Sequence, residues 1–337
     1  MKVPIVFSFD DNFALPASIA IKSLVDCAGP DTEYEIFILY DKVLSVDTRR
    51  KIDSICHVTW VLVDDAQFSD VPLRKNWNRN TYYRLIVPRL FAGYEKIIWS
   101  DVDVLFRGDV GAVMDIPLKN MDWAGIAAEI NDDDMICHVR RPENTNKFIY
   151  WPGFMVYNVR RWLERDMTKR CFSIIEKYGD RLTFCDLDVL NLVCRDIGRI
   201  PLKYCVLESI ADSRRIEDAS EYKWLSRVYS ASELSAAREK PLIVHYAGIN
   251  PKVWNRRRED IPDYYWQYIE RSPFFAKDFF FPSAATHLRS AILFFAYKMC
   301  PVHAVREALK GKWRRVKWEN QYQRAQLKRL EAGNGNW

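Results

Sequence analysis

Two aspartates separated by a single residue could hold a metal ion. Residues 96–99 read as a strand, and Asp101, Val102 and Asp103 lie at its end. Carboxylates spaced in this way can jointly bind a hard divalent cation, which can also take the oxygens of a diphosphate. A pair of solvated loop acids is the more common meaning of this short pattern, so the chemistry depends on what accompanies it.

A histidine about 140 residues later offers the missing ligand. His245 follows the apolar residues 242–244, and Gly248 and Lys252 come shortly after it. An imidazole suits Mn²⁺ as a third ligand and favours it over Mg²⁺, which stays the alternative. Gly248 would let the backbone approach a phosphate, and Lys252 would add a positive charge. A structural histidine is the competing interpretation. Four further histidines have no comparable neighbours in the sequence: His57, His138, His287 and His303.

The segments that must position these residues alternate between the apolar patterns typical of strands and of helices. Strand-like residues are 3–9, 34–40, 58–63 and 96–99, and helix-like residues are 17–27, 47–55 and 82–90. This alternation predicts an α/β fold with a mostly parallel sheet covered on both faces. Ligands bind beyond the carboxyl ends of such strands. Two of these ends are acidic, at residues 10–11 and 101–103.

Composition excludes several classes of protein. The chain has 337 residues, of which 49% are hydrophobic and 14% aromatic, so it is neither disordered nor of low complexity. Residues 283–337 carry eleven Lys or Arg and three acids, a net charge of +8. The whole chain is +5, which leaves −3 for the other 282 residues. A basic nucleic-acid-binding core is therefore not expected.

Cysteine usage and the N-terminus indicate a cytoplasmic protein. The eight cysteines form neither a CxxC pair nor a zinc-ribbon spacing, as is typical of reduced thiols. The first residues lack the pattern of a signal peptide. The longest apolar run, residues 291–297, is far shorter than the roughly 20 residues that span a bilayer.

The basic tail suggests attachment to a membrane surface. Trp313, Trp318 and Tyr322 interleave with Lys and Arg after the short apolar run. This combination is typical of an amphipathic segment drawn to anionic lipid, here on the inner face of the cytoplasmic membrane. A solvated basic helix packed on the core is the alternative.

Five sequence blocks, in order, resemble glycosyltransferase family 8. These retaining sugar-nucleotide transferases include lipopolysaccharide galactosyl- and glucosyltransferases and, more distantly, glycogenin. The resemblance covers about residues 3–255, and its blocks are residues 5–13, 81–85, 100–106, 184–191 and 245–254. It implies a GT-A fold, with a mostly parallel central sheet, over residues 1–282, of which about 1–120 bind the nucleotide. A helical, basic extension over residues 283–337 would follow.

The resemblance also implies roles in binding a UDP-sugar. Ser8 and Asp10 would meet the uracil and ribose, with Asn12 and Phe13 beside them. Arg84 would lie near the sugar and phosphate of the donor. Asp101, Asp103 and His245 would bind the metal, with Val102 between the acids, and Gly248 and Lys252 would hold the diphosphate.

On the sugar side the chain departs from its relatives. Asp186 would bind the sugar hydroxyls, and Asp188 is either a second catalytic acid or a structural one. Leu187 stands where bacterial relatives often have a glutamine, and Trp151-Pro152 stands where they often have the asparagine that binds the sugar. With no amide available, a same-face attack by the acceptor suits the chain better than a double displacement through either aspartate.

The implied reaction is the metal-dependent, retaining transfer of a hexose. The donor would be UDP-galactose or UDP-glucose, and the acceptor a glycan, on lipopolysaccharide or another cell-surface glycolipid. Because of the changes at Leu187 and Trp151, the alternative is a pseudoenzyme that binds a nucleotide or glycan without turnover.

Glu129 lies near the position of an acid that relatives use around the acceptor site.

Overall fold

The computed structural model describes residues 1–68, 71, 79–248, 252–256, 258–275 and 284–318. The chain divides into two compact units, Met1–Ala247 and Gly248–Trp337. The domain boundary predicted between residues 282 and 283 lies at the edge of residues 276–283, outside the described residues, so it stays a prediction.

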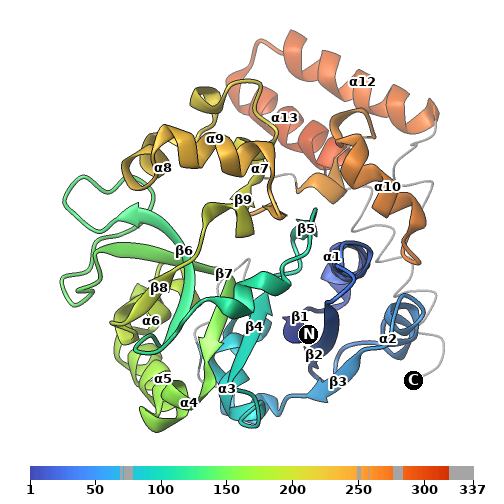
Figure 1. The fold of residues 1–337 in the computed structure, drawn as a ribbon. Helices are drawn as coiled ribbons and strands as arrows, with labels where there is room; N and C mark the ends of the chain where they lie inside the picture. Colours follow the sequence, from blue (N-terminus) through green and yellow to red (C-terminus); the bar gives the residue numbers. More distant parts are fainter. Residues whose placement is uncertain (69–70, 72–78, 249–251, 257, 276–283, 319–337) are drawn as a thin grey trace. The chain divides into compact units, whose positions relative to one another are not determined.

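A seven-stranded sheet forms the centre of the first unit, in the order β3-β2-β1-β4-β7-β6-β8 (Figure 1). Only β7 is antiparallel to its neighbours; the other pairs run parallel. The predicted α/β fold with a mostly parallel sheet is confirmed. The strands are β1 (Lys2–Ser8), β2 (Glu33–Tyr40), β3 (Thr59–Leu62), β4 (Lys96–Ser100), β6 (Trp123–Ile130), β7 (Phe148–Asn158) and β8 (Ile197–Arg199).

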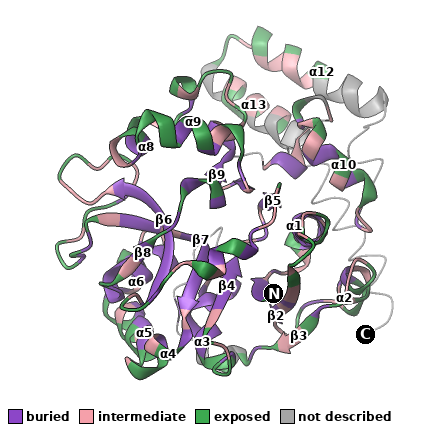
Figure 2. Ribbon diagram, viewed as in Figure 1, coloured by how far each residue is buried: buried purple, intermediate pink, exposed green. Residues whose placement is uncertain are grey.

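The middle strands are buried on both faces, as Figure 2 shows for β4 and β7. Continuous apolar runs such as residues 3–7 are what a covered parallel sheet requires. One core cluster joins Trp99 of β4 and Tyr157 of β7 to Trp162 and Leu190 on the covering helices. The helices of this unit are α1 (Ala14–Asp26), α2 (Val46–Asp53), α3 (Val87–Leu90), α4 (Val159–Glu164), α5 (Met167–Tyr178), α6 (Asp186–Val193), α7 (Glu208–Ala211), α8 (Tyr222–Val228) and α9 (Ala231–Glu239).

The helix predicted over residues 82–90 is mostly a 3-10 helix. Residues Arg79–Ile86 form this helix, and only Val87–Leu90 are α-helical. Pro88 has no N–H with which to close an α-helical bond to the carbonyl of Arg84. That carbonyl instead accepts a hydrogen bond of 2.7 Å from the Tyr157 hydroxyl. The tighter helix fixes Arg84 against the sheet.

A second, three-stranded sheet brings distant residues together. Its order is β5-β10-β9, with β5 (Val104–Phe106), β10 (Ile243–His245) and β9 (Val206–Leu207). Strand β5 begins directly after Asp103, and His245 pairs with Val104 in the antiparallel register. The N–H of Tyr246 also donates to the carbonyl of Asp103 at 2.8 Å. This pairing sets His245 beside the two aspartates.

The second unit holds α10 (Asp263–Arg271), α12 (Ala284–Met299) and α13 (His303–Trp318). Trp313 of α13 packs on Phe294 and Tyr297 of α12, with ring centroids 5.2 and 5.9 Å apart, so the two helices form a hairpin. Among the described residues, no helix is long and apolar enough to cross a membrane. Tyr322, which the tail prediction includes, lies outside the described residues.

Candidate active site

Asp101, Asp103 and His245 meet where β4 ends and β5 begins. The Nε2 atom of His245 lies 3.1 Å from Oδ1 of Asp103 and 3.8 Å from Oδ2 of Asp101. One donor atom from each side chain falls within 4.8 Å of the others. The structure therefore brings together all three residues that the sequence predicts as metal ligands. Val102 is buried between the acids.

The donor set and its surroundings fit a divalent cation. Two carboxylates and one imidazole combine hard oxygen ligands with a nitrogen that Mn²⁺ accepts. Gly153 of β7 passes directly behind them, and its carbonyl accepts the N–H of Asp101 at 2.8 Å. A Cβ atom on Gly153 would lie 2.5 Å from Cε1 of His245 and 3.2 Å from Oδ2 of Asp101. The close approach of strand and ligands thus requires glycine.

The second nitrogen of His245 faces Cys205. The Cys205 sulfur lies 3.3 Å from Nδ1, and both side chains are buried. Burial lowers the pKa of His245, but Cys205 and Asp103 raise it well above its ordinary value. When Nε2 faces a cation, the ring proton is on Nδ1. The Nδ1–H group then donates a hydrogen bond to the Cys205 sulfur, and this bond orients the ring. Nothing in the sequence pattern indicated Cys205, because the contact exists only through the pairing of β10 with β9.

Arg84 links Asp101 of this cluster to Asp186 at the start of α6. Its buried guanidinium donates to Oδ1 of Asp101 at 2.7 Å and lies 3.1 Å from Oδ2 of Asp186. It also donates to the carbonyl of Pro152 at 2.7 Å and stacks over the Trp99 ring, 4.9 Å from its centroid. The Arg84 guanidinium is therefore fixed by several contacts, and its positive charge is balanced by the carboxylates of Asp101 and Asp186.

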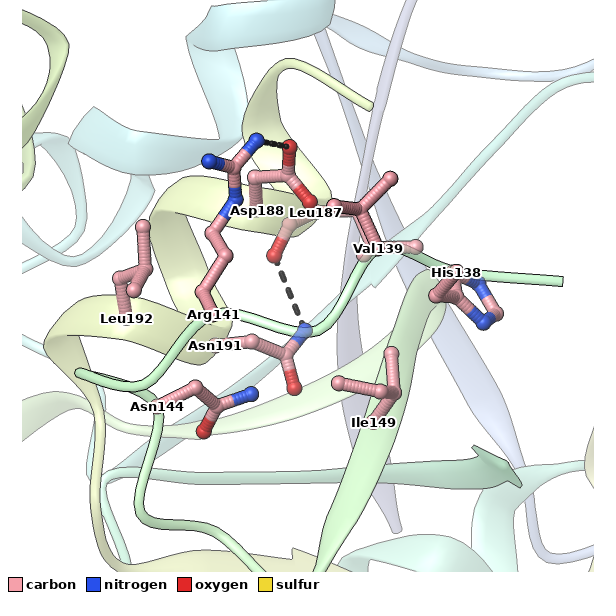
Figure 3. A pocket seen from close by; sticks show the side chains of 9 residues that line it. All are labelled: His138, Val139, Arg141, Asn144, Ile149, Leu187, Asp188, Asn191 and Leu192. Atoms are coloured by element: carbon pink, nitrogen blue, oxygen red, sulfur yellow. Dashed lines mark hydrogen bonds and ion pairs between the residues drawn. The ribbon is translucent and has the colours of Figure 1, made fainter. Parts of the chain in front are cut away.

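The two acids at the start of α6 face different partners. Asp186 is buried beside Arg84, and burial raises its pKa to about 7, against the influence of Arg84. Asp188 accepts the N–H groups of Thr183 and Phe184 at 2.6 and 3.1 Å and pairs with Arg141 at 3.0 Å (Figure 3). Residues two apart on a helix point to different sides. Asp186 thus contacts Arg84, which also contacts the candidate metal ligand Asp101. Asp188 belongs to a separate network with Arg141.

Leu187 lines a small cavity together with apolar and polar side chains. Val139, Ile149 and Leu192 line it as well, and so do the polar side chains of Arg141, Asn144, Asp188 and Asn191 (Figure 3). A leucine offers this space neither a hydrogen bond nor a nucleophile. Trp151, the other departure from the relatives, donates its indole N–H to Nε2 of His138 at 3.1 Å. The sequence around His138 does not indicate this contact, because His138 lies in the loop before β7 and Trp151 lies within that strand.

The end of β1 is held in place by its own side chains. The Ser8 hydroxyl donates to the carbonyl of Leu39 at 2.9 Å. Oδ1 of Asp10 accepts the N–H groups of Asn12 and Phe13 at 3.0 and 3.2 Å, which caps the 3-10 turn before α1. Phe13 is 36% exposed. The predicted nucleotide residues therefore form one ordered turn at a strand's carboxyl end.

Gly248 and Lys252 belong to the second unit. Gly248 has a φ of 72°, which is a conformation that favours glycine. The Lys252 ammonium lies 5.8 Å from the centroid of the Trp254 ring. Their predicted contact with a diphosphate stays a prediction.

This sheet, with carboxylates and a histidine at the strand ends, has the GT-A fold. More narrowly, the chain belongs to glycosyl transferase family 8, whose family model matches residues 4–258. The resemblance seen in the sequence is confirmed.

Known relatives are similar in sequence and fold. The lipopolysaccharide 1,2-glucosyltransferase of Escherichia coli is 22% identical over 263 residues, which cover 74% of this chain and 72% of that protein. The fold resembles the galactosyltransferase LgtC, solved with donor and acceptor sugar analogs, with a TM-score of 0.65 and 19% identity over 83% of this chain and 99% of LgtC. It also resembles the bifunctional glycosyltransferase WbbM, with a TM-score of 0.63 and 25% identity. That match covers 81% of this chain but half (50%) of WbbM.

Proposed function

We propose that this glycosyltransferase moves a hexose from UDP-glucose or UDP-galactose to a glycan acceptor, with retention of configuration. The acceptor would be lipopolysaccharide or another cell-surface glycolipid. The observation that carries the proposal is the cluster of Asp101, Asp103 and His245, joined through Arg84 to Asp186. The glucosyltransferase and galactosyltransferase among the relatives support a hexose donor.

The cluster would hold Mn²⁺, with Mg²⁺ as the alternative. When bound, the ion would supply positive charge that stabilises the negative charge developing on the leaving diphosphate. Arg84 keeps Asp101 in place through its bond of 2.7 Å. Gly248 and Lys252 would contact the diphosphate. Ser8, Asp10, Asn12 and Phe13 would bind the nucleoside, with the Phe13 ring as a stacking surface.

Asp186 is the acid best placed for the sugar. It opens α6 beside Arg84, whereas Asp188 is already engaged by Arg141 and two backbone N–H groups. We assign Asp186 to the sugar hydroxyls and Asp188 to holding the start of α6. Since Leu187 supplies no nucleophile, attack by the acceptor on the same face as the leaving diphosphate fits these residues better than a double displacement.

The helical hairpin of the second unit would bind the inner face of the cytoplasmic membrane. Exposed apolar side chains follow one another at helical spacing along α12 and into the turn after it: Ile292, Phe295, Met299 and Val302. Basic residues accompany them on both helices, including Lys298, Arg306, Lys310 and Lys312. Apolar and cationic groups of this kind bind anionic lipid, with each near-surface cation adding about 1 kcal/mol.

A pseudoenzyme is the second candidate, which Leu187 favours. Leu187 supplies no amide at the position where relatives often carry a glutamine. Such a protein would bind UDP with a metal but release none from any UDP-sugar.

Release of UDP from a panel of UDP-sugars tests the proposal. The panel contains UDP-glucose, UDP-galactose and their N-acetyl forms, each with Mn²⁺ or with chelator. We expect metal-dependent release from one glucose or galactose donor. Asp101→Asn should abolish that release and metal-dependent UDP binding, whereas Asp134→Asn, in an exposed loop, should change neither. Metal-dependent UDP binding without release, even with lipopolysaccharide present, would favour the pseudoenzyme. Absence of UDP binding would contradict both.

A further inference from the structure

A buried carboxylate anchors the loop between β6 and β7 from inside. Glu129 of β6 has no exposed surface (0%). Its carboxylate accepts the N–H groups of Ile136, Cys137 and His138, the last two at 3.1 and 3.0 Å. It also lies 3.0 Å from Nδ1 of His138. Burial raises the pKa of Glu129, but these hydrogen bonds outweigh it and hold the pKa near 2. Glu129 is therefore an ionised anchor rather than a group free to meet an acceptor.

His138 connects Glu129 to Trp151 through its two ring nitrogens. Its Nε2 atom lies 3.1 Å from the indole nitrogen of Trp151, which can only donate. Nε2 must then be unprotonated, and the proton on Nδ1 points to Glu129. A second proton on Nε2 would face the indole N–H, so we place the ring in its neutral form.

Trp151 directly precedes the two residues of β7 that contact Arg84 and pass behind the candidate metal cluster. The next two residues of β7 are Pro152, whose carbonyl binds Arg84, and Gly153, which passes behind the cluster. On its other side, the His138 ring lies 5.2 Å from that of Phe184, two residues before Asp186. Trp151 is half-buried. From these neighbours we infer that Trp151 borders the region between the metal ligands and the start of α6, where a donor sugar would lie.

We propose that Glu129 and His138 are positioning residues that fix the indole of Trp151 as an apolar wall of the donor-sugar pocket, and so set which sugar the pocket accepts. This inference rests on the proposed UDP-sugar function. Because the indole N–H is used by His138, Trp151 offers the sugar only carbon and π surface. Such a surface packs on the C–H face of a hexose. The relative affinity of the pocket for glucose and galactose would thus depend on the shape of that face. The asparagine amide that relatives often have at this position would instead distinguish the two sugars by their hydroxyl groups.

Comparing the binding of UDP with that of UDP-glucose and UDP-galactose tests this role. Dissociation constants are measured with Mn²⁺ for the wild type, His138→Ala and His138→Gln, and His57→Ala serves as a matched control outside the site. We expect His138→Ala to weaken binding of the preferred UDP-sugar about three- to tenfold, the value of one hydrogen bond. UDP itself, which has no sugar, should bind within about twofold of the wild type. His138→Gln, which keeps an acceptor near the position of Nε2, should recover part of the loss.

A double-mutant cycle with Trp151→Phe separates positioning from general damage. Trp151→Phe removes the indole N–H, so adding His138→Ala to it should change the preference between UDP-glucose and UDP-galactose no further. Equal weakening of UDP and UDP-sugar by His138→Ala, or full additivity of the two substitutions, would overturn the inference. If the wild type fails to bind UDP with Mn²⁺, the proposed function fails first, which is a distinct result.

Discussion

Arg84 joins two acidic side chains that come from separate parts of the chain. It contacts Asp101 at 2.7 Å and Asp186 at 3.1 Å; Asp101 directly follows β4, and Asp186 begins α6. Removing one partner of a buried ion pair leaves the other charge uncompensated. Arg84 therefore couples the geometry of the metal ligands to that of the acid proposed to hold the sugar.

Cys205 should tune metal binding through His245. Cys205→Ala removes the sulfur that lies 3.3 Å from Nδ1 and frees the ring to turn. Since partners of this kind contribute about 10- to 100-fold to metal affinity, we expect Mn²⁺ affinity to fall by at least about tenfold. Cys205→Ser should retain more of it. Calorimetric titration of Mn²⁺ in the presence of UDP measures the change, with Cys56→Ala as control; equal affinity in Cys205→Ala and wild type would contradict the role.

Glu129 should stabilise the fold in a pH-dependent way. Its pKa is lowered in the folded state to about 2 from an ordinary value of 4.5. The stabilisation is therefore complete above pH 4.5 and is lost as the pH falls toward 2. Glu129→Gln should lower the free energy of unfolding by about 3 kcal/mol at pH 7, and by about 1 kcal/mol less at pH 4. Urea unfolding at both pH values tests this, with the exposed Glu239→Gln as control. A pH-independent difference would show that the ionised carboxylate is not the cause.

Among the elements, β7 has the closest approach to the metal cluster. Gly153→Ala would place a Cβ atom 2.5 Å from Cε1 of His245. The histidine must move, so we expect Mn²⁺ affinity to drop by more than about tenfold, because coordination tolerates little displacement. Gly93→Ala is the matched control, since a Cβ there meets nothing within 4 Å. Unchanged Mn²⁺ affinity in Gly153→Ala would mean that the three side chains do not bind the metal in this arrangement.

Helix α6 separates two acids that the sequence presents as a pair. Asp186 and Asp188 flank one leucine, but the helical rotation sends them to Arg84 and Arg141, respectively. The partners of each acid depended on which loops pack against its first turn, and no local pattern contains that information.

At the scale of the whole molecule, the proposed membrane attachment concerns residues that the catalytic cluster does not use. Deleting residues 283–337 should abolish binding to vesicles that contain anionic lipid, while metal-dependent UDP binding persists. In the full chain, Phe295→Glu with Met299→Glu should weaken vesicle binding as well, because it places charge on the exposed apolar face of α12. Co-sedimentation with anionic and with neutral vesicles measures both. Retained binding after the deletion would refute the assignment.

The sequence by itself determined the class of fold and the family, and it predicted the residue types of the candidate metal cluster. Alternating periodicities identify strands and helices because burial repeats every two or 3.6 residues along the chain. Short motifs such as residues 101–103 can be recognised in the sequence because their residues lie close together along the chain. These features are local, so they can be read without a structure.

Only the tertiary structure decided which side chains act together. His245 reaches Asp103 through the pairing of β10 with β5, and Arg84 reaches Asp186 across about a hundred residues of chain. His138 showed no significant neighbours in the sequence, yet it lies between Glu129 and Trp151. Strand pairing and loop packing create such contacts, and their partners are set by the whole sheet rather than by spacing along the chain.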